Sequence, residues 1–172
     1  MTAATYGRVV LNTTVTLVGT TNIDGSLTFS TQSSNLGRLI FSGETLQLRS
    51  SSASIVGNSS FVGDSQANLQ LSNGGVGSNG TLNFVTGAQV LHDLSLSFTD
   101  VSREIALGSD LTISNGGDFA GFGHFNGVFD LNGHKLTIDA SSEFLTPVSA
   151  TDGMFRGSSS SELHINSSVW FG

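Results

Sequence analysis

Short pairs of apolar residues, separated by polar residues, form the most regular pattern in this chain. In residues 127–140, GVFDLNGHKLTIDA, the pairs Phe129/Leu131 and Leu136/Ile138 flank a polar break. Alternation of apolar and polar residues predicts β-strands with one buried face. The Asn-Gly pair in the break suits a tight hairpin turn, because both residues tolerate a positive φ. A corner between two sheets would also let both pairs point into one interior, so this stretch alone allows both interpretations.

Recurrence of the pattern favours the corner. Break-flanked pairs are also present in residues 8–19, 38–48 and 104–113. Successive copies begin at spacings of 30, 30, 36 and 24 residues, and a weak further copy follows; their first apolar residues are Val9, Leu39, Leu69, Ile105, Phe129 and Leu163. A period of 20–50 residues is typical of solenoids, in which each coil buries its apolar face against its neighbours.

We therefore predict an all-β chain, folded as a parallel β-helix (β-solenoid) of about five to six coils of roughly 30 residues. Residues 1–172 are expected to form a single domain. A third apolar piece between the copies, such as Leu27/Phe29, gives each coil three short strands. An antiparallel sandwich or barrel is the alternative fold, and no window of the chain keeps the apolar spacing of a helix.

Phenylalanine is unusually frequent, with 12 Phe against one Tyr and one Trp. Phe suits a dry, stacked interior because its side chain has no polar group that needs a partner. We expect most of the Phe to lie in the core. The Gly-rich stretch 116–127 departs from the alternation and places Phe119, Phe122 and Phe125 three residues apart. This stretch is expected to be a loop or bulged rung, acting either as a cap or as an exposed adhesive loop.

One coil carries a family resemblance. The wording VFDLNGHKLTI, with its Asn-Gly-His corner at residues 132–134 and its Leu-x-Ile return, resembles a coil of right-handed parallel β-helix proteins. The haemagglutinin-like and autotransporter passenger domains, phage tailspikes and polysaccharide lyases belong to this group. Enrichment in Ser, Thr, Asn and Gly without Cys is similar to the adhesin-like branch. The resemblance implies a fold rather than an activity, because these families differ in chemistry.

Charge and composition exclude several classes of protein. Charged residues make up only 11% of the chain, the formal net charge is −7, and the six Lys and Arg are scattered singly. A nucleic-acid partner is therefore not expected. The chain has no Cys, which excludes disulfides and thiolate metal sites. No stretch of about 20 apolar residues is present, so we expect no membrane span.

Candidate chemistry is sparse. Two outward carboxylates that met in a groove could act as the acid and base of glycan cleavage; the candidates are Asp93, Asp100, Asp110, Asp118, Asp130 and Asp139. Solvation of the surface is the simpler role for them. The four histidines occur singly, without the spacing of a transition-metal site; they are His92, His124, His134 and His164. We assign no catalytic, cofactor-binding or metal-ligating residue and predict that the chain is not an enzyme.

The ends of the predicted solenoid suggest a function. Terminal coils expose unpaired backbone groups, and the sequence shows no amphipathic helix to cap them. Either the chain is an excerpt of a longer solenoid, or its ends pair with other copies. We expect a structural or adhesive protein that self-associates end to end, outside the cell or on its surface; a virion component is another setting that fits. The alternative is a glycan-binding or glycan-cleaving module, tailspike-like or polysaccharide lyase-like, with surface glycans as partners.

Overall fold

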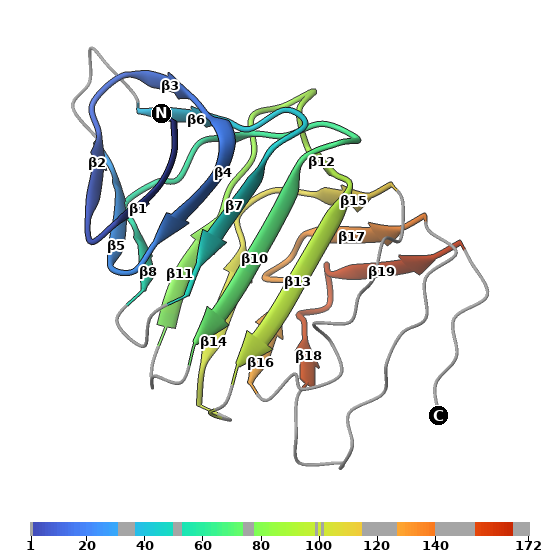
Figure 1. Cartoon of the computed structure of the whole chain (residues 1–172). Coiled ribbons are helices and arrows are strands. Elements are labelled where there is room, and N and C mark those ends of the chain that lie inside the picture. The colour runs from blue at the N-terminus through green and yellow to red at the C-terminus, as the bar shows by residue number, and fades with distance from the viewer. Residues whose placement is uncertain are drawn as a thin grey trace.

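The computed structural model describes residues 2–30, 37–49, 53–73, 78–98, 100, 102–114, 127–139 and 154–166. Every regular element in these ranges is a β-strand, and every pair of neighbouring strands is parallel. The strands stack as a β-solenoid, which confirms the predicted fold class (Figure 1). The antiparallel sandwich or barrel is wrong, because partners in each sheet come from successive coils.

The first face of the solenoid is one five-stranded sheet, sheet A, whose strands run side by side in Figure 1. In spatial order it contains β1 (Thr2–Tyr6), β4 (Val18–Ile23), β7 (Thr45–Leu48), β10 (Asn68–Asn73) and β13 (Asp93–Phe98). From β1 to β13 the chain therefore makes about four full turns.

The second face is formed by two sheets in line. Sheet B contains β2 (Val9–Leu11), β5 (Ser26–Phe29) and β8 (Ser54–Val56), and sheet D contains β11 (Ser78–Leu82), β14 (Glu104–Leu107), β16 (Val128–Asp130) and β18 (Met154–Arg156). The two sheets meet where Gly80 of β11 packs on Ile55 of β8. An added Cβ at Gly80 would lie 2.0 Å from the Ile55 carbonyl oxygen. A side chain at position 80 would therefore force these two coils apart.

The third face is also built from two sheets. Sheet C contains β3 (Thr14–Thr16), β6 (Arg38–Ile40) and β9 (Phe61–Val62), and sheet E contains β12 (Val90–Leu91), β15 (Leu111–Ile113), β17 (Lys135–Ile138) and β19 (Glu162–Ile165). A parallel bridge between Phe61 and Phe84 links sheet C to the next coil. Beyond β13, the described residues supply only the second and third faces of each coil.

The coil length differs from the prediction. Leu46 stacks on Leu69, Leu69 on Leu94, and Ile105 on Phe129, which gives spacings of 23, 25 and 24 residues instead of 30. The predicted copies do not occupy equivalent places; their first residues lie in β2, β6, β10, β14 and β16, on three different faces. Apolar pairs flank every corner, so the sequence pattern does not distinguish one kind of corner from another. The predicted copies therefore include corners of different kinds. The count of about four turns is somewhat lower than the five to six coils expected.

The core follows the alternation of the strands. In β5, β14 and β17 every second side chain is buried, and the residues between them face outward. Phe61 lies at the centre of an aromatic cluster, with ring centroids 5.1 Å from Phe29, 5.9 Å from Phe41 and 5.5 Å from Phe84. These rings are almost completely buried, and six of the seven Phe that the structure describes lie in the core, as expected; Phe155 is half-buried. Phe119, Phe122 and Phe125 lie outside the described residues.

The polar break at residues 132–135 is a corner and not a hairpin. The preceding strand β16 pairs with β14 and β18, whereas the following strand β17 pairs with β15 and β19. Asn132 adopts a positive φ of 48°, and its side-chain Nδ2 donates to the Leu107 carbonyl one coil away at 2.9 Å. Ser109 and Ser161 act similarly, since their hydroxyls accept backbone N–H bonds from the neighbouring coil. Side chains thus satisfy the backbone groups that the corner leaves unpaired.

Candidate functional site

Open strand edges at the two ends of the stack are the most distinctive surfaces of the described structure. At the N-terminal end, β1, β2 and β3 each pair with a strand on one side only, as far as the described part of the chain shows. At the other end, β18 and β19 are paired on one side only, within the residues that the structure describes. Unpaired edges are templates for a further strand, which proteins usually cover or blunt.

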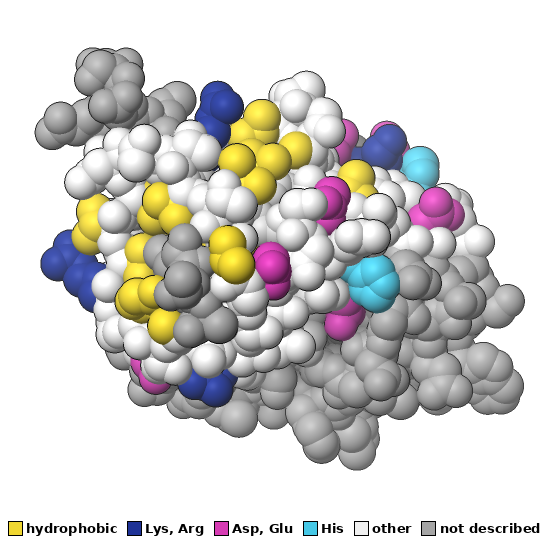
Figure 2. All heavy atoms as spheres, turned by 45° about the horizontal axis from the view of Figure 1, so that its top comes forward, with side chains coloured by type: hydrophobic (Ala, Val, Ile, Leu, Met, Phe, Trp, Pro, Cys, Tyr) yellow, Lys and Arg dark blue, Asp and Glu magenta, His cyan; other side chains and the backbone are white. Residues whose placement is uncertain are grey.

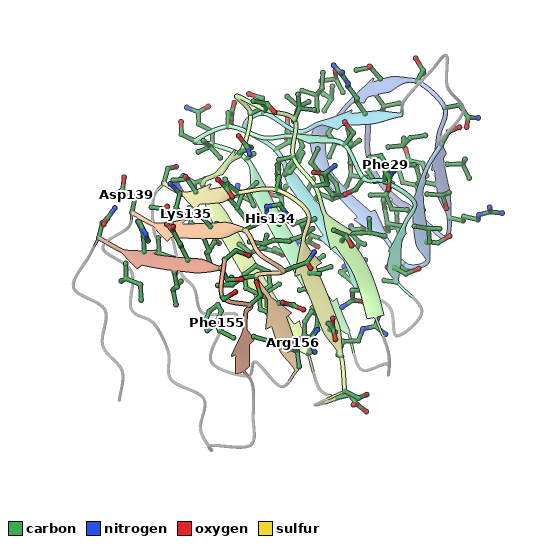
Figure 3. The ribbon with its side chains drawn as sticks, turned by 180° about the vertical axis from the view of Figure 1, so that it is seen from behind. Phe29, His134, Lys135, Asp139, Phe155 and Arg156 are labelled. Atoms are coloured by element: carbon green, nitrogen blue, oxygen red, sulfur yellow. The ribbon has the colours of Figure 1, made fainter. Side chains whose placement is uncertain are left out.

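The C-terminal end is incompletely buried. Leu111, Leu136 and Leu163 occupy the same place in successive coils, and their exposures are 1%, 2% and 38%. Phe155, in β18, is half-buried and packs edge-to-face on the buried ring of Phe129 at 5.8 Å (Figure 3). The inward side of the last coil therefore offers apolar surface that inner coils bury against a neighbour.

Apolar side chains are also exposed at the N-terminal end. The inward residues Tyr6 and Val15 are only partly buried against the core, whereas Leu11 and Leu17 are buried. On the outer surface, Val10 is 45% and Val18 is 61% exposed. The first coil thus exposes apolar side chains both from its inward positions and on its outer surface.

The coil to which a backbone N–H donates depends on whether its residue faces inward or outward. The N–H of the inward residue Leu39 donates to Ser60 in the following coil, and the N–H of Phe61 does the same to Asn83. The N–H of the outward residue Glu162 donates to His134 in the preceding coil. Because successive residues of a strand direct their backbone groups alternately to the two sides, inward and outward residues present them at opposite ends.

An ion cluster fastens the last coil to the two coils before it. The guanidinium of Arg156 lies 2.5 Å from a carboxylate oxygen of Glu104 and 2.5 Å from one of Asp130 (Figure 3). These two hydrogen bonds raise the pKa of Arg156, that from Asp130 first. For Asp130, burial opposes ionisation, but the bonds from Arg156 and from the Asn132 N–H outweigh it and lower the carboxyl pKa. A carboxyl held ionised in this way is poorly suited to act as a general acid.

The other candidate side chains are dispersed. His134 Nδ1 lies 3.6 Å from Asp110, His164 Nε2 lies 2.9 Å from Glu162, and Asp139 follows β17 on the surface (Figure 3). The remaining ones lie apart: Asp93 begins β13, His92 precedes it, and Asp100 binds the backbone N–H of Ser102. Asp118 and His124 lie outside the described residues. No group of three or more His, Asp and Glu in the described ranges is placed to hold a metal ion.

Sequence reasoning missed a polar ladder on the outer face of sheet A. Thr5, Asn22, Gln47, Gln70 and Ser95 stack in register on five successive strands. The amide Nε2 of Gln47 donates to Oε1 of Gln70 at 2.5 Å. We call this set the sheet A ladder. Its members recur about every 23–25 residues from Asn22 onward, so a search with a shorter period would have found it.

Comparison of the chain with protein-family models, with curated proteins and with solved structures found no match. Within the described residues, no helix has the length and apolar character needed to cross a lipid bilayer.

Proposed function

We propose that this protein is a non-enzymatic structural or adhesive protein that self-associates through the ends of its solenoid. Its setting would be the cell surface or the extracellular space, or a virion. The observation that carries the proposal is the pair of open ends, at which β1, β2, β3, β18 and β19 keep an unpaired edge in the described residues. Addition of strands at such an edge gains main-chain hydrogen bonds, and neighbouring side chains add specificity.

The energetics of solenoids support this proposal. Each coil is stabilised mainly by contact with its neighbours, so a terminal coil lacks half of its interface. Leu163 shows the effect directly, because it exposes 38% of its surface where Leu136 exposes 2%. Contact with a second copy would bury this surface and stabilise the last coil.

The test is the size of the purified chain across a concentration series. We expect the weight-average mass from light scattering to rise with concentration, and negative-stain micrographs to show rods of constant width and variable length. A mass of one chain, 17.8 kDa, that stays constant up to high micromolar concentration would contradict the proposal. Rods of variable width would indicate non-specific aggregation and would also contradict it.

Glycan binding is the second candidate, and the sheet A ladder favours it. Amides and hydroxyls in register form a flat face suited to the hydroxyl groups of a neutral polysaccharide. Replacement of Gln47 and Gln70 by Leu should abolish retention on immobilised neutral polysaccharides if this face binds them. The matched control replaces the outward Thr112 and Thr137 of sheet E by Leu. Equal retention of both variants, or no retention of the natural chain, would remove this candidate.

A further inference from the structure

We propose that self-association is head-to-tail, with the C-terminal coil of one copy seated on the N-terminal coil of the next in the register of the solenoid itself. The occupant of each open end is thus the opposite end of a second copy. This inference rests on the proposed function and adds the polarity and the register of the contact. In this register β19 pairs with β3 of the next copy and β18 with β2, all parallel.

Backbone geometry supports this polarity. In β19 the N–H of Glu162 is used by the preceding coil, so that of Leu163 points to the open edge. Next to β3, the carbonyl of Thr13 and the N–H of Leu17 bond to the strand of the following coil. The backbone N–H and carbonyl of Thr14 therefore point to the open edge. The C-terminal edge therefore presents the backbone groups of inward residues, and the N-terminal edge presents those of outward residues. Neighbouring coils inside the solenoid pair in the same way, with inward residues of one coil facing outward residues of the next.

Side chains match in the same register. Alignment of Leu163 with Val15 of the next copy would stack the inward column Leu111, Leu136 and Leu163 of sheet E on the inward column Val15, Leu39 and Phe61 of sheet C. On the second face, Phe155 would stack on Val9 of the next copy, and the small Gly157 would stack on its Leu11. Large residues thus meet smaller ones, and the half-exposed Leu163 and Phe155 become buried.

The charge distribution disfavours contact between two C-terminal ends. In residues 1–86, three Lys and Arg balance three Asp and Glu. Residues 87–172 contain three Lys and Arg against ten Asp and Glu, so the net charge of −7 belongs to the second half. Figure 2 shows most Asp and Glu of one face towards the C-terminal side, and most of its hydrophobic side chains on the other side. Two C-terminal ends in contact would repel within the screening length of about 8–10 Å.

Two variants, each blocked at one end, test the polarity. Thr14→Pro removes an N–H that points to the open N-terminal edge and leaves the pairing of β3 with β6 intact. Leu163→Lys places a charge on the exposed apolar residue of the C-terminal coil. The matched controls are Thr14→Ala and Val56→Lys; Val56 is 45% exposed on the outer surface, away from both ends. Circular dichroism verifies that all variants fold.

Head-to-tail contact predicts that each blocked variant alone is monomeric and that both controls assemble like the natural chain. An equimolar mixture of the two blocked variants should double in mass and stop at the dimer, because the dimer has no intact end left. A dimer of either blocked variant alone would mean contact between like ends and would overturn the polarity, while leaving self-association intact. A natural chain that stays monomeric would overturn the proposed function itself.

Discussion

Removal of the central ring of the aromatic cluster should be among the most damaging single changes to this fold. Phe61 is fully buried and touches the rings of Phe29 and Phe41, in the preceding coil, and of Phe84, in the following coil. Truncation of a buried Phe to Ala costs about 3–5 kcal/mol, as lost transfer free energy plus the cavity left behind. Packed rings in the coils on both sides limit the collapse of that cavity, so we expect the upper part of this range. Total stabilities of about 5–15 kcal/mol make such a loss severe.

Urea denaturation followed by circular dichroism at 218 nm measures this loss. The matched control is Val62→Ala at the next position, which faces outward and is half-buried; we expect it to cost less than about 1 kcal/mol. Phe61→Leu should fall between the two, because it retains most of the apolar volume. Equal costs for Phe61→Ala and Val62→Ala would refute the inward assignment of Phe61 and the stacking argument built on it.

Three further changes probe the corners and the last coil. Asn132→Ala should lower the free energy of unfolding by about 1–3 kcal/mol, because it loses a hydrogen bond and strains the backbone at positive φ. Asn132→Gly should cost less, and urea denaturation measures both changes. Arg103→Met should cost about 1–3 kcal/mol in the same assay, because the buried guanidinium donates to the Ala53 carbonyl at 2.7 Å. Since the pKa of Asp130 is lowered on folding, its stabilising effect is complete above the unfolded pKa near 4 and is lost as the pH falls through the folded pKa. The protection factor of the Arg156 amide, which compares its exchange rate with the intrinsic rate at the same pH, should therefore fall below about pH 4, and less so in Asp130→Asn.

The fold class could be predicted because alternation and recurrence both leave a direct trace in the sequence. Residues such as Phe129, Leu131, Leu136 and Ile138 are buried as their alternation predicts. The coil length could not be predicted in the same way, because corners of all three kinds have polar breaks flanked by apolar pairs. Only pairing shows that Val9 and Leu39 lie on different faces.

Contacts between coils were beyond the reach of the sequence for a different reason. Arg156 meets Asp130 and Glu104 because these residues lie 26 and 52 positions earlier, so their meeting depends on the coil length. If the assumed period is wrong by a few residues, the expected partner of Arg156 shifts along its strand by that number of residues at every coil, and the contact is not predicted. The sheet A ladder escaped detection for the same reason, since its Asn22 and Gln47 align only at a spacing of 25 residues.

Stability and assembly are coupled in a solenoid whose ends bind each other. A closed domain owes its stability to contacts within one copy, whereas the last coil here lacks one neighbour and leaves Leu163 exposed. A second copy that binds only the folded end stabilises it by mass action, so the unfolding temperature should rise with protein concentration. The end-blocked variant Leu163→Lys removes this linkage without touching the inner coils. Its unfolding temperature should therefore be independent of concentration, and an equal rise in both proteins would mean that the ends do not carry the association.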